Sequence, residues 1–326
     1  MKALVYQGVE AIEFKDVPDP LVQADEHLIK VEAVGICGSD MHAYLGHDAR
    51  RPAPLILGHE AAGIIQGGDD DGMRVTVNPL VTCLTCRACT SGRENLCPNR
   101  QIISMMPRQG AFAQYIAMPK RNLVEVPDNV PLRKAALAEP LAVSWHVARL
   151  ALKALHSSMD RRALVIGGGA IGLAAALALN AMGVVDVVIV EPDDARRQFL
   201  SEQCDQQVVS STDKSFPIVI DAVGIGVTRA SASELVEAGG VIAHVGLGDN
   251  GPGFDVRRAT LQEITFIGTY TYTAQDFRDT AAALFDGRLG PLNWTETCSL
   301  AEGATAFADL RAGRVAVPKV VLEPWA

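Results

Sequence analysis

Positive charge and aromatic rings are scarce in this sequence. Its 326 residues include 29 lysines and arginines against 38 aspartates and glutamates, which gives a formal net charge of −9. Nucleic-acid binding depends on basic side chains that displace counterions from phosphates, so we expect no nucleic-acid partner. Aromatic residues make up 5% of the chain and glycines number 29, a balance that favours an α/β protein.

The start of the sequence does not have the pattern typical of a secretory signal. The opening MKALVYQGVEAIEF has no basic stretch followed by an apolar core, so we expect no secretory signal and a cytoplasmic location. In that reducing compartment the 7 cysteines are expected to be thiols or thiolates, because disulfides persist mainly in oxidising compartments.

One uncharged run imitates a membrane helix. Residues 163–185 contain no charged side chain, and a run of this length satisfies the criterion for crossing a bilayer. Three consecutive glycines at 167–169 would break a helix near its start, and a β-rich run precedes them. We therefore predict a buried strand followed by a helix, and we expect no membrane partner.

The chain is longer than one hydrophobic core usually supports, which predicts two domains. Up to about residue 140, short strands punctuated by glycine and proline are predicted, for example ALVYQG and MRVTVNP. From residue 163 onward, strand-like and helix-like segments alternate, as in ALVIGG, AIGLAAALALNAMG and VVDVVIVE. This alternation predicts a parallel sheet with crossover helices.

Six strands are predicted in this second region, as in a complete doubly wound sheet, and helices are predicted at 231–239 and 280–287. Only residues 210–217 separate the third strand from the fourth, too few for the usual crossover helix. Eight extended residues reach about 26 Å, whereas crossing three strand spacings needs about 14 Å. We therefore predict a bare loop across the sheet.

The first turn of this region carries a glycine fingerprint. Gly167, Gly169 and Gly172 fit the pattern GxGxxG, with Ala170 and Ile171 between the last two glycines. Between a strand and a helix, the first glycine allows a tight turn, the second lets the backbone approach a pyrophosphate, and the third lets helix and strand pack closely. Amides at the helix start then bind the phosphates. The alternative is a packing turn without a ligand.

Glu191 ends the next predicted strand, nineteen residues after Gly172. A carboxylate at this position accepts hydrogen bonds from the adenosine ribose hydroxyls and repels a 2′-phosphate, which favours NAD over NADP. Arg196 and Arg197 follow on the next helix. They are interpreted as contacts to a 2′-phosphate, as a solvated helix face or, for Arg196, as a cover over the adenine.

Four cysteines lie within fifteen residues in the pattern CxxCxxCx7C: Cys83, Cys86, Cys89 and Cys97. A short loop with this spacing can place four sulfurs about 2.3 Å from a zinc ion, at the corners of a tetrahedron. A full thiolate shell has no open position for a substrate, so the predicted zinc is structural. The alternative is an iron–sulfur cluster, whose common compact run ends with a three-residue gap.

A second set of candidate ligands mixes three residue types. It comprises Cys37 in GICGSDMH, His59 and Glu60 in LGHEAAG, and Glu139 in LAEPLAV. A thiolate, an imidazole and carboxylates are the ligands that a zinc site with an exchangeable position uses. For any one of these residues taken alone, the structural interpretation is favoured: a buried thiol, a satisfied histidine or a surface carboxylate. Cys204 and Cys298 lie apart from any motif and are expected to be buried thiols.

These segments together resemble the zinc-dependent medium-chain dehydrogenase/reductase family, in its sorbitol (polyol) dehydrogenase-like branch. The resemblance also rests on CLTCRACTSGRENLC, VIGGGAIG and the closing GRVAVPKVVL, and it runs nearly end to end. It implies a catalytic zinc held by Cys37, His59 and a glutamate, for which Glu60 and Glu139 are not distinguished. With the structural ion, this makes two zinc ions per chain.

The resemblance also implies a domain arrangement. A GroES-like, mainly β catalytic domain would comprise residues 1–142 and be completed by 272–326. A Rossmann NAD-binding domain would comprise residues 143–271. The family commonly forms dimers or tetramers, so a homodimer or homotetramer is expected.

A proton path is implied as well. Ser39 would bond the substrate oxygen and pass its proton through the cofactor ribose toward His42, since an imidazole exchanges protons with solvent near neutral pH. Asp40 is expected to orient His59. The alternatives are a turn-capping serine and a surface histidine.

The predicted substrate is a small-molecule secondary alcohol of polyol, sugar or sugar-acid type, oxidised by hydride transfer to NAD. Thr271 departs from the pattern, because polyol members of the branch carry an arginine there. Arg50 and Arg51 are interpreted as solvated surface or as a pair that favours an acidic or phosphorylated substrate. The alternative functions are a threonine dehydrogenase-like oxidation of an amino alcohol and a non-catalytic nucleotide-binding protein on the same scaffold.

Overall fold

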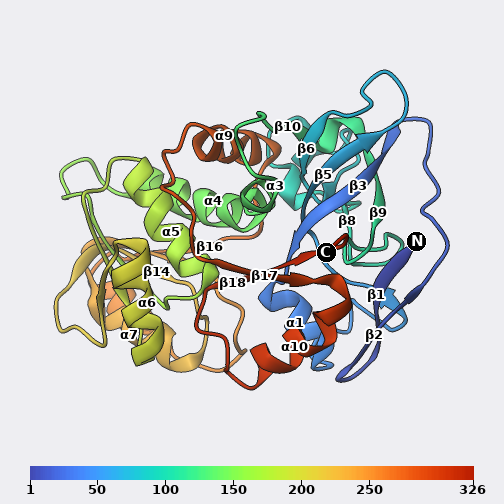
Figure 1. Ribbon diagram of the computed structural model, residues 1–326. Helices are drawn as coiled ribbons and strands as arrows, with labels where there is room; N and C mark the ends of the chain where they lie inside the picture. Colours follow the sequence, from blue (N-terminus) through green and yellow to red (C-terminus); the bar gives the residue numbers. More distant parts are fainter. The chain divides into compact units, whose positions relative to one another are not determined.

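The computed structural model describes residues Met1–Ala326, which form two compact units (Figure 1). Unit 1 comprises Met1–Glu139, Thr273–Asp286 and Thr295–Ala326, and unit 2 comprises Pro140–Tyr272 and Gly287–Trp294. No helix combines the length and the apolar character that a bilayer crossing requires.

Unit 1 is built on a seven-stranded sheet. Six of its strands lie in the order β10-β6-β5-β3-β18-β17, and β9 pairs with β3 as well. These strands are β3 (Glu26–Gly35), β5 (Glu60–Gln66), β6 (Arg74–Val77), β9 (Tyr115–Pro119), β10 (Leu123–Glu125), β17 (Thr295–Ser299) and β18 (Lys319–Glu323). The smaller sheets of unit 1 contain β1 (Lys2–Gly8), β2 (Ala11–Asp16) and β4 (Leu55–Ile56), and β7 (Leu80–Val81) with β8 (Gln101–Ile102).

The helices of unit 1 are mostly short. They are α1 (Gly38–Tyr44), α2 (Arg87–Thr90), α3 (Leu132–Ala135), α9 (Ala274–Phe285) and α10 (Gly303–Arg311), with 3₁₀ turns η1 (Glu94–Leu96), η2 (Lys120–Asn122) and η3 (Leu300–Glu302). The core of the unit includes Leu4, Ile29, Phe112 and Phe307, which are completely buried. Each such side chain contributes about 1.5–3 kcal/mol through burial.

The last strand of the chain completes this sheet. β18 runs antiparallel to β3, with Val321 opposite Gly35, and parallel to β17. The Ile36 amide donates to the Val320 carbonyl oxygen at 2.9 Å, which ties the end of β3 to β18. Residues more than 280 positions apart in the sequence therefore lie side by side where β3 leads into α1.

Unit 2 contains the six predicted strands, all parallel, in the order β13-β12-β11-β14-β15-β16. They are β11 (Arg162–Ile166), β12 (Asp186–Val190), β13 (Gln207–Val209), β14 (Phe216–Asp221), β15 (Val236–His244) and β16 (Thr265–Gly268). β14 is buried along its whole length, as expected of a central strand covered on both faces. The doubly wound parallel sheet and the helix-free connection from β13 to β14 are confirmed.

The helices of unit 2 are α5 (Ala170–Ala181), α6 (Asp194–Cys204), α7 (Gly226–Leu235) and α8 (Val256–Leu261), and α4 (Ala138–Ala154) begins in unit 1 and continues into unit 2. The strand and helix predicted within 163–185 are β11 and α5. The helix predicted at 231–239 is wrong at both ends. Its true start is capped by the Thr228 hydroxyl, which accepts a hydrogen bond from the Ile225 amide, and Val236 already pairs with β14.

The helix predicted at 280–287 also begins too late. α9 starts at Ala274, because Thr273 and Asp276 form a capping box in which each side chain accepts a bond from the other residue's amide. That box satisfies amides that a helix start otherwise leaves unpaired.

Candidate metal and cofactor sites

The turn between β3 and α1 holds the first candidate ligand, Cys37. It is the residue just before α1, and its amide donates to Asp40 Oδ2 at 3.0 Å. His59 and Glu60 stand at the start of β5, which pairs with β3 so that Glu60 lies opposite Gly35. This pairing brings the ligand atoms of Cys37, His59 and Glu60 within 4.8 Å of one another.

His59 is held from behind by two buried groups. Its Nδ1 lies 3.5 Å from Asp40 Oδ1 and 3.3 Å from Ser104 Oγ. Burial lowers the pKa of His59, but the negative charges of Asp40 and Cys37 outweigh burial and raise this pKa well above its ordinary value. The expected contact between Asp40 and His59 is present, and it leaves Nε2 as the nitrogen for a ligand on the other side of the ring.

Glu60 is completely buried, and its two carboxylate oxygens have different surroundings. Oε1 accepts a hydrogen bond of 2.6 Å from Lys319 Nζ, whereas Oε2 is buried without a hydrogen-bond partner. Room for Oε2 exists because residue 35 is glycine, since a Cβ at Gly35 would lie 2.0 Å from that oxygen. An unpartnered buried carboxylate oxygen is costly unless a cation or donor meets it.

Lys319 comes from the final strand, β18, and is 3% exposed. Its Nζ also donates to the Ile36 carbonyl oxygen at 2.9 Å. Burial lowers the pKa of Lys319, while the charges of Glu60, Cys37 and Glu139 raise it, and the net shift is upward. The lysine is therefore a fixed cation behind the candidate ligands.

Glu139 lies in the first turn of α4 and is buried. Its charge acts on Lys319, which places it near the same group of side chains. Its carboxylate is not among the atoms that lie within 4.8 Å of one another. The geometry of the triad therefore favours Glu60 over Glu139 as the direct partner of Cys37 and His59.

These three donors fit a zinc ion. A thiolate, an imidazole and a carboxylate are borderline-soft and hard donors of the kind that catalytic zinc sites combine, with one position left for water or substrate. The negative charges of Asp40, Cys37 and Glu60 gather at this point, and Oε2 of Glu60 has no hydrogen-bond partner there although Lys319 binds Oε1. A bound cation would neutralise that charge.

The two predicted relay residues lie on α1. Ser39 is half-buried, and His42 is half-buried in the last turn of the helix. The interpretation of Arg51 as solvated surface is wrong, because the residue is 3% exposed and bonded internally. Only Arg50 has the exposed side chain that was expected, and it binds Asp48 through Nε and a terminal nitrogen at 2.8 Å each.

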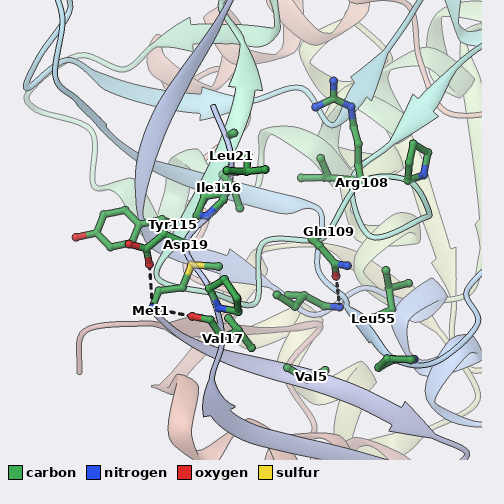
Figure 2. A pocket seen from close by; sticks show the side chains of 18 of the residues that line it. Met1, Val5, Val17, Asp19, Leu21, Leu55, Arg108, Gln109, Tyr115 and Ile116 are labelled. Carbon is green, nitrogen blue, oxygen red and sulfur yellow. Dashed lines mark hydrogen bonds and ion pairs between the residues drawn. The ribbon is translucent and has the colours of Figure 1, made fainter. Parts of the chain in front are cut away.

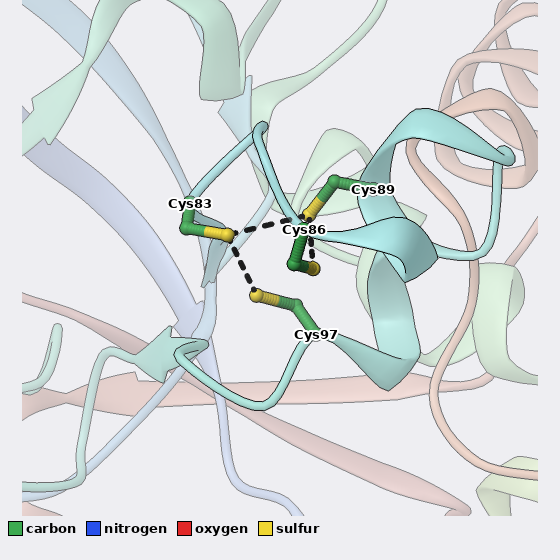
Figure 3. Close-up of side chains that lie close together, drawn as sticks. All are labelled: Cys83, Cys86, Cys89 and Cys97. Carbon is green, nitrogen blue, oxygen red and sulfur yellow. Dashed lines mark hydrogen bonds between the residues drawn. The ribbon is translucent and has the colours of Figure 1, made fainter.

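The four-cysteine loop converges on one point (Figure 3). Its sulfurs are separated by 3.5 Å for Cys86 and Cys89, 3.5 Å for Cys83 and Cys97, and 3.9 Å for Cys83 and Cys89. A tetrahedron of sulfurs about 2.3 Å from zinc has edges of about 3.8 Å, so the separations fit that ion. The Thr85 amide lowers the pKa of Cys83 to about 5, whereas burial and neighbouring sulfurs raise the pKa of Cys89 to about 12.

The remaining two cysteines behave as expected of inert thiols, although both are half-buried instead of fully buried. Burial raises the pKa of Cys204 to about 11 and, with nearby carboxylates, that of Cys298 to about 11. At neutral pH both therefore remain protonated and weakly reactive.

The glycine fingerprint lies between β11 and α5. Gly167 has a φ of +99°, which only glycine adopts without strain, and a Cβ at Gly172 would lie 1.7 Å from the Gly167 carbonyl oxygen. A Cβ at Gly169, by contrast, would meet no protein atom within 4 Å. The backbone at Gly169 is thus open on the side where the amides of Ala170 and Ile171 begin the helix.

Glu191 follows β12 and is 4% exposed. Its Oε2 accepts a bond of 2.9 Å from the Gly168 amide, and its Oε1 accepts one of 3.0 Å from the Asp193 amide. Arg196 pairs with the same carboxylate at 3.4 Å, and Arg197 donates to the Glu191 carbonyl oxygen at 2.8 Å. Both arginines are therefore engaged with Glu191 instead of being a purely solvated face.

A cavity of about 590 Å³ also opens in unit 1 (Figure 2). Its lining includes Val17, Leu21, Leu55, Tyr115 and Ile116, and the Met1 ammonium group bonds to Asp19 at its rim. None of the predicted ligand, relay or cofactor residues lines it. It therefore belongs to neither candidate site.

Comparison with known proteins decides the family. Residues 23–128 match the alcohol dehydrogenase GroES-like domain, and residues 170–286 match the zinc-binding dehydrogenase domain. The sequence is 31% identical over 308 residues to the L-galactonate-5-dehydrogenase of Escherichia coli (strain K12), covering 89% of this chain and 88% of that protein. The chain belongs to the zinc-dependent medium-chain dehydrogenase/reductase family.

Further relatives of this dehydrogenase have related activities. It is 34% identical over 269 residues to the sorbitol dehydrogenase of Bacillus subtilis (strain 168), across 76% of this chain and 75% of the relative. The acetophenone reductase of Geotrichum candidum, solved in complex with NAD, superposes with a TM-score of 0.88 at 27% identity, over 99% of this chain and 97% of that one. The predicted GroES-like domain and Rossmann-type sheet are confirmed, and the protein is a dehydrogenase that acts on CH–OH groups.

Three residues have roles around the candidate metal site that the sequence did not predict. Ser104 and Lys319 were not singled out, and Arg51 was not connected to Ser39. The positive φ of Ser104 and the contact of Lys319 with Glu60 arise only when β5, β18 and the loop before Gly110 fold together. No local pattern in the sequence predicts these contacts.

Proposed function

We propose that this dehydrogenase oxidises a secondary alcohol of the polyol, sugar or sugar-acid class, with zinc at Cys37, His59 and Glu60 and NAD as the hydride acceptor. The observation that supports it most is the convergence of Cys37, which is half-buried, with the buried His59 and Glu60, where one carboxylate oxygen is left without a hydrogen-bond partner. A protein that only bound a nucleotide would have no use for a thiol, an imidazole and a carboxylate whose ligand atoms lie within 4.8 Å of one another.

The chain's own residues would hold the ion in a defined way. When bound, zinc supplies Lewis acidity, which lowers the pKa of a substrate hydroxyl and stabilises negative charge on its oxygen. Asp40 and Ser104 contact Nδ1 of His59, so Nε2 would be the nitrogen available to the ion, and Lys319 binds Glu60 through Oε1. Glu139 would then be a nearby carboxylate that could ligate through water.

Proton removal would fall to Ser39 and His42. The Ser39 hydroxyl accepts the proton of the substrate hydroxyl while it passes its own proton on, so the serine stays neutral throughout. His42, half-buried at the end of α1, would return the proton to solvent.

The cofactor would bind unit 2. The open backbone at Gly169 and the amides of Ala170 and Ile171 suit a pyrophosphate, and NAD supplies the acceptor carbon for the hydride. Glu191 would bind the adenosine ribose hydroxyls, and Arg196 would lie beside it. The carboxylate of Glu191 disfavours a 2′-phosphate, so NAD is proposed over NADP.

The substrate class is proposed from the relatives. Their names specify a sugar acid in one case and a polyol in another. Thr271, at the place of the expected arginine, has a φ of +46° and a buried hydroxyl oxygen without a hydrogen-bond partner. The missing arginine counts against a polyhydroxylated substrate, so the substrate class rests on the relatives and not on Thr271.

The deciding experiment is an NAD-reduction screen on zinc-loaded protein with sorbitol, xylitol, galactonate, threonine and 2-propanol. We expect turnover with a polyol or sugar acid and two zinc ions per chain. Cys37→Ser should lower kcat by at least 10³-fold and remove one of the two ions, because it takes away a ligand. The Kd for NADH should change less than twofold.

Full activity of the Cys37→Ser variant would refute the role of Cys37. Turnover of threonine alone would favour the amino-alcohol alternative. A parent protein with one zinc ion per chain and no turnover would favour a non-catalytic protein.

We also propose a cytoplasmic homodimer or homotetramer. Support for self-association comes from β16, an edge strand of the six-stranded sheet whose Phe266 is 42% exposed. An exposed apolar edge strand is a template for pairing with another chain.

A further inference from the structure

Arg51 is a buried cation that the proposed chemistry does not use directly. Its side chain is 2% exposed and lies in unit 1, between the Ser39 turn and the loop that contains Ser104. A guanidinium is rarely buried without defined partners, because desolvating a charge costs several kcal/mol. What it contacts therefore indicates what it does.

Two short contacts anchor the guanidinium. A terminal nitrogen of Arg51 donates to Asp48 Oδ2 at 2.6 Å, and Nε donates to the Ser104 carbonyl oxygen at 3.0 Å. The Asp48 carboxylate is shared with Arg50, and although burial raises the Asp48 pKa, the two arginines lower it further, to about 2. The carboxylate is thus a permanent anion that holds the planar guanidinium in one orientation.

Two longer contacts then reach Ser39. One terminal nitrogen of Arg51 lies 3.3 Å from the Ser39 carbonyl oxygen, and the other lies 3.4 Å from Ser39 Oγ. The backbone and the hydroxyl of the same serine are therefore both held by one rigid plane. Four polar contacts in total fix the Arg51 guanidinium: two with Asp48 and Ser104, and two with Ser39.

We propose that Arg51 is a positioning residue for Ser39: it fixes the direction in which the Ser39 hydroxyl can donate its proton. This inference rests on the proposed function, in which Ser39 transfers the proton of the substrate.

The chemical reason is that a guanidinium donates hydrogen bonds and cannot accept them. With Arg51 donating to one lone pair of Ser39 Oγ, the serine proton cannot point back at the arginine. The second lone pair and the proton remain for the substrate hydroxyl and for the next acceptor in the path. A proton arriving on one side of the oxygen is thus matched by a proton leaving on the other.

Arg50 provides a matched control for this inference. It binds the same Asp48 carboxylate, but its side chain is 58% exposed, whereas that of Arg51 is 2% exposed. Arg51→Gln leaves Asp48 paired with Arg50, and Arg50→Gln leaves it paired with Arg51. Each variant therefore keeps the carboxylate neutralised, and only the first loses the contacts to Ser39.

The first measurement needs no substrate. Hydrogen–deuterium exchange of the peptide that covers residues 37–44 should be about tenfold faster in Arg51→Gln, because the Ser39 carbonyl contact is lost. In Arg50→Gln it should match the parent protein. Parent-like exchange in Arg51→Gln would overturn the proposal, because Arg51 would then not hold this turn.

The second measurement is a double-mutant cycle with the best substrate of the screen. Arg51→Gln should lower kcat about 10- to 100-fold with the KM for NAD within twofold, and Arg50→Gln should stay within twofold of the parent. The variant Ser39→Ala with Arg51→Gln should be no slower than Ser39→Ala alone, because Arg51 acts through Ser39. Zinc content should remain two ions per chain in every variant.

Fully additive losses in the cycle would overturn the proposal, since they would mean that Arg51 acts independently of Ser39. If Arg51→Gln loses its zinc or its fold, the same double-mutant cycle is measured with Arg51→Lys. Lysine keeps the positive charge but lacks the planar guanidinium that contacts Asp48, Ser104 and Ser39 together. Parent-like kcat in Ser39→Ala would instead refute the proton relay while leaving the metal triad and the exchange result standing.

Discussion

The backbone around Glu191 holds its carboxylate in one position before the proposed cofactor binds. Amides of Gly168 and Asp193 each hold one of its oxygens, and Gly168 has no Cβ, which would otherwise lie 3.1 Å from Oε2. The glycine-rich turn and the acidic residue are therefore one unit. A ribose hydroxyl pair would meet a carboxylate whose position is already fixed, at little cost in side-chain entropy.

Replacing Glu191 with serine should change cofactor choice. We expect Glu191→Ser to raise the KM for NAD about 10- to 100-fold and to raise kcat/KM with NADP, because the charge that repels a 2′-phosphate is gone while Arg196 remains. The two cofactors are compared by initial-rate kinetics. Asp194→Ser is the control, since Asp194 is a nearby but 93% exposed carboxylate. An unchanged preference for NAD in Glu191→Ser would contradict the assignment.

At this scale the sequence predicts residue types better than residue roles. The motifs were sufficient to select Cys37, His59, Glu60 and Glu139, but they did not rank the two glutamates. The ranking depends on the space above Gly35 and on Lys319, which is 259 positions from Glu60. Similarly, Arg50 and Arg51 are neighbours of the same residue type, and only tertiary packing makes their side chains 58% and 2% exposed.

At the scale of elements, the thiol loop has almost no regular structure of its own. Its helix α2 has four residues and its turn η1 has three, and no side chain in α2 is buried. Such a segment gains little from apolar burial, so a central ion is what would hold it together. The Glu94 side chain accepts a bond of 2.7 Å from the Ala274 amide, which joins the loop to the start of α9.

Breaking the four-thiol cluster should therefore remove a structural ion. We expect Cys89→Ser to carry one zinc per chain instead of two, as measured by elemental analysis, and to melt several degrees lower, at roughly 2–4 °C per kcal/mol lost. Cys204→Ser, which changes a half-buried thiol outside the cluster, should retain both ions. Iron in the parent protein, or two zinc ions in Cys89→Ser, would refute the structural zinc.

Element types were predicted well, and their ends were not. The six strands of unit 2 and the bare loop after β13 follow from apolar runs and from a chain length that physically limits the connection. The starts of α7 and α9 depend on single hydroxyl–amide contacts at Thr228 and Thr273. Such contacts appear in the sequence only as common residues at common spacings.

At the scale of the whole molecule, each unit carries a different part of the proposed reaction. Unit 1 contains both metal clusters, and unit 2 contains the glycine turn and Glu191. The sheet of unit 2 ends in β13 on one side and in β16 on the other. Around β16, Val256, Leu261 and Phe266 are exposed by 66%, 66% and 42%. An apolar edge of this kind is expected to be covered in an oligomer.

A charge on that edge should weaken self-association. We expect Phe266→Asp to have the mass of a monomer, 34.7 kDa, by light scattering after gel filtration, while the parent protein has at least twice that mass. Val185→Asp is the control, because Val185 is a 93% exposed apolar residue outside any strand. A parent protein that is already monomeric would refute the proposed oligomer, and an unchanged mass in Phe266→Asp would move the interface elsewhere.

The position of Lys319 in the final strand has a consequence for biosynthesis. During translation, Glu60 leaves the ribosome long before the lysine that binds it, which follows 259 residues later. At 5–20 residues per second this interval lasts roughly 13–50 s. Throughout that time Cys37 and Glu60 lack the strand that encloses them, so we expect the proposed catalytic ion to be captured only after Lys319 has been added. A ribosome-stalled chain that stops before residue 319 would therefore be a poor metal acceptor at this site.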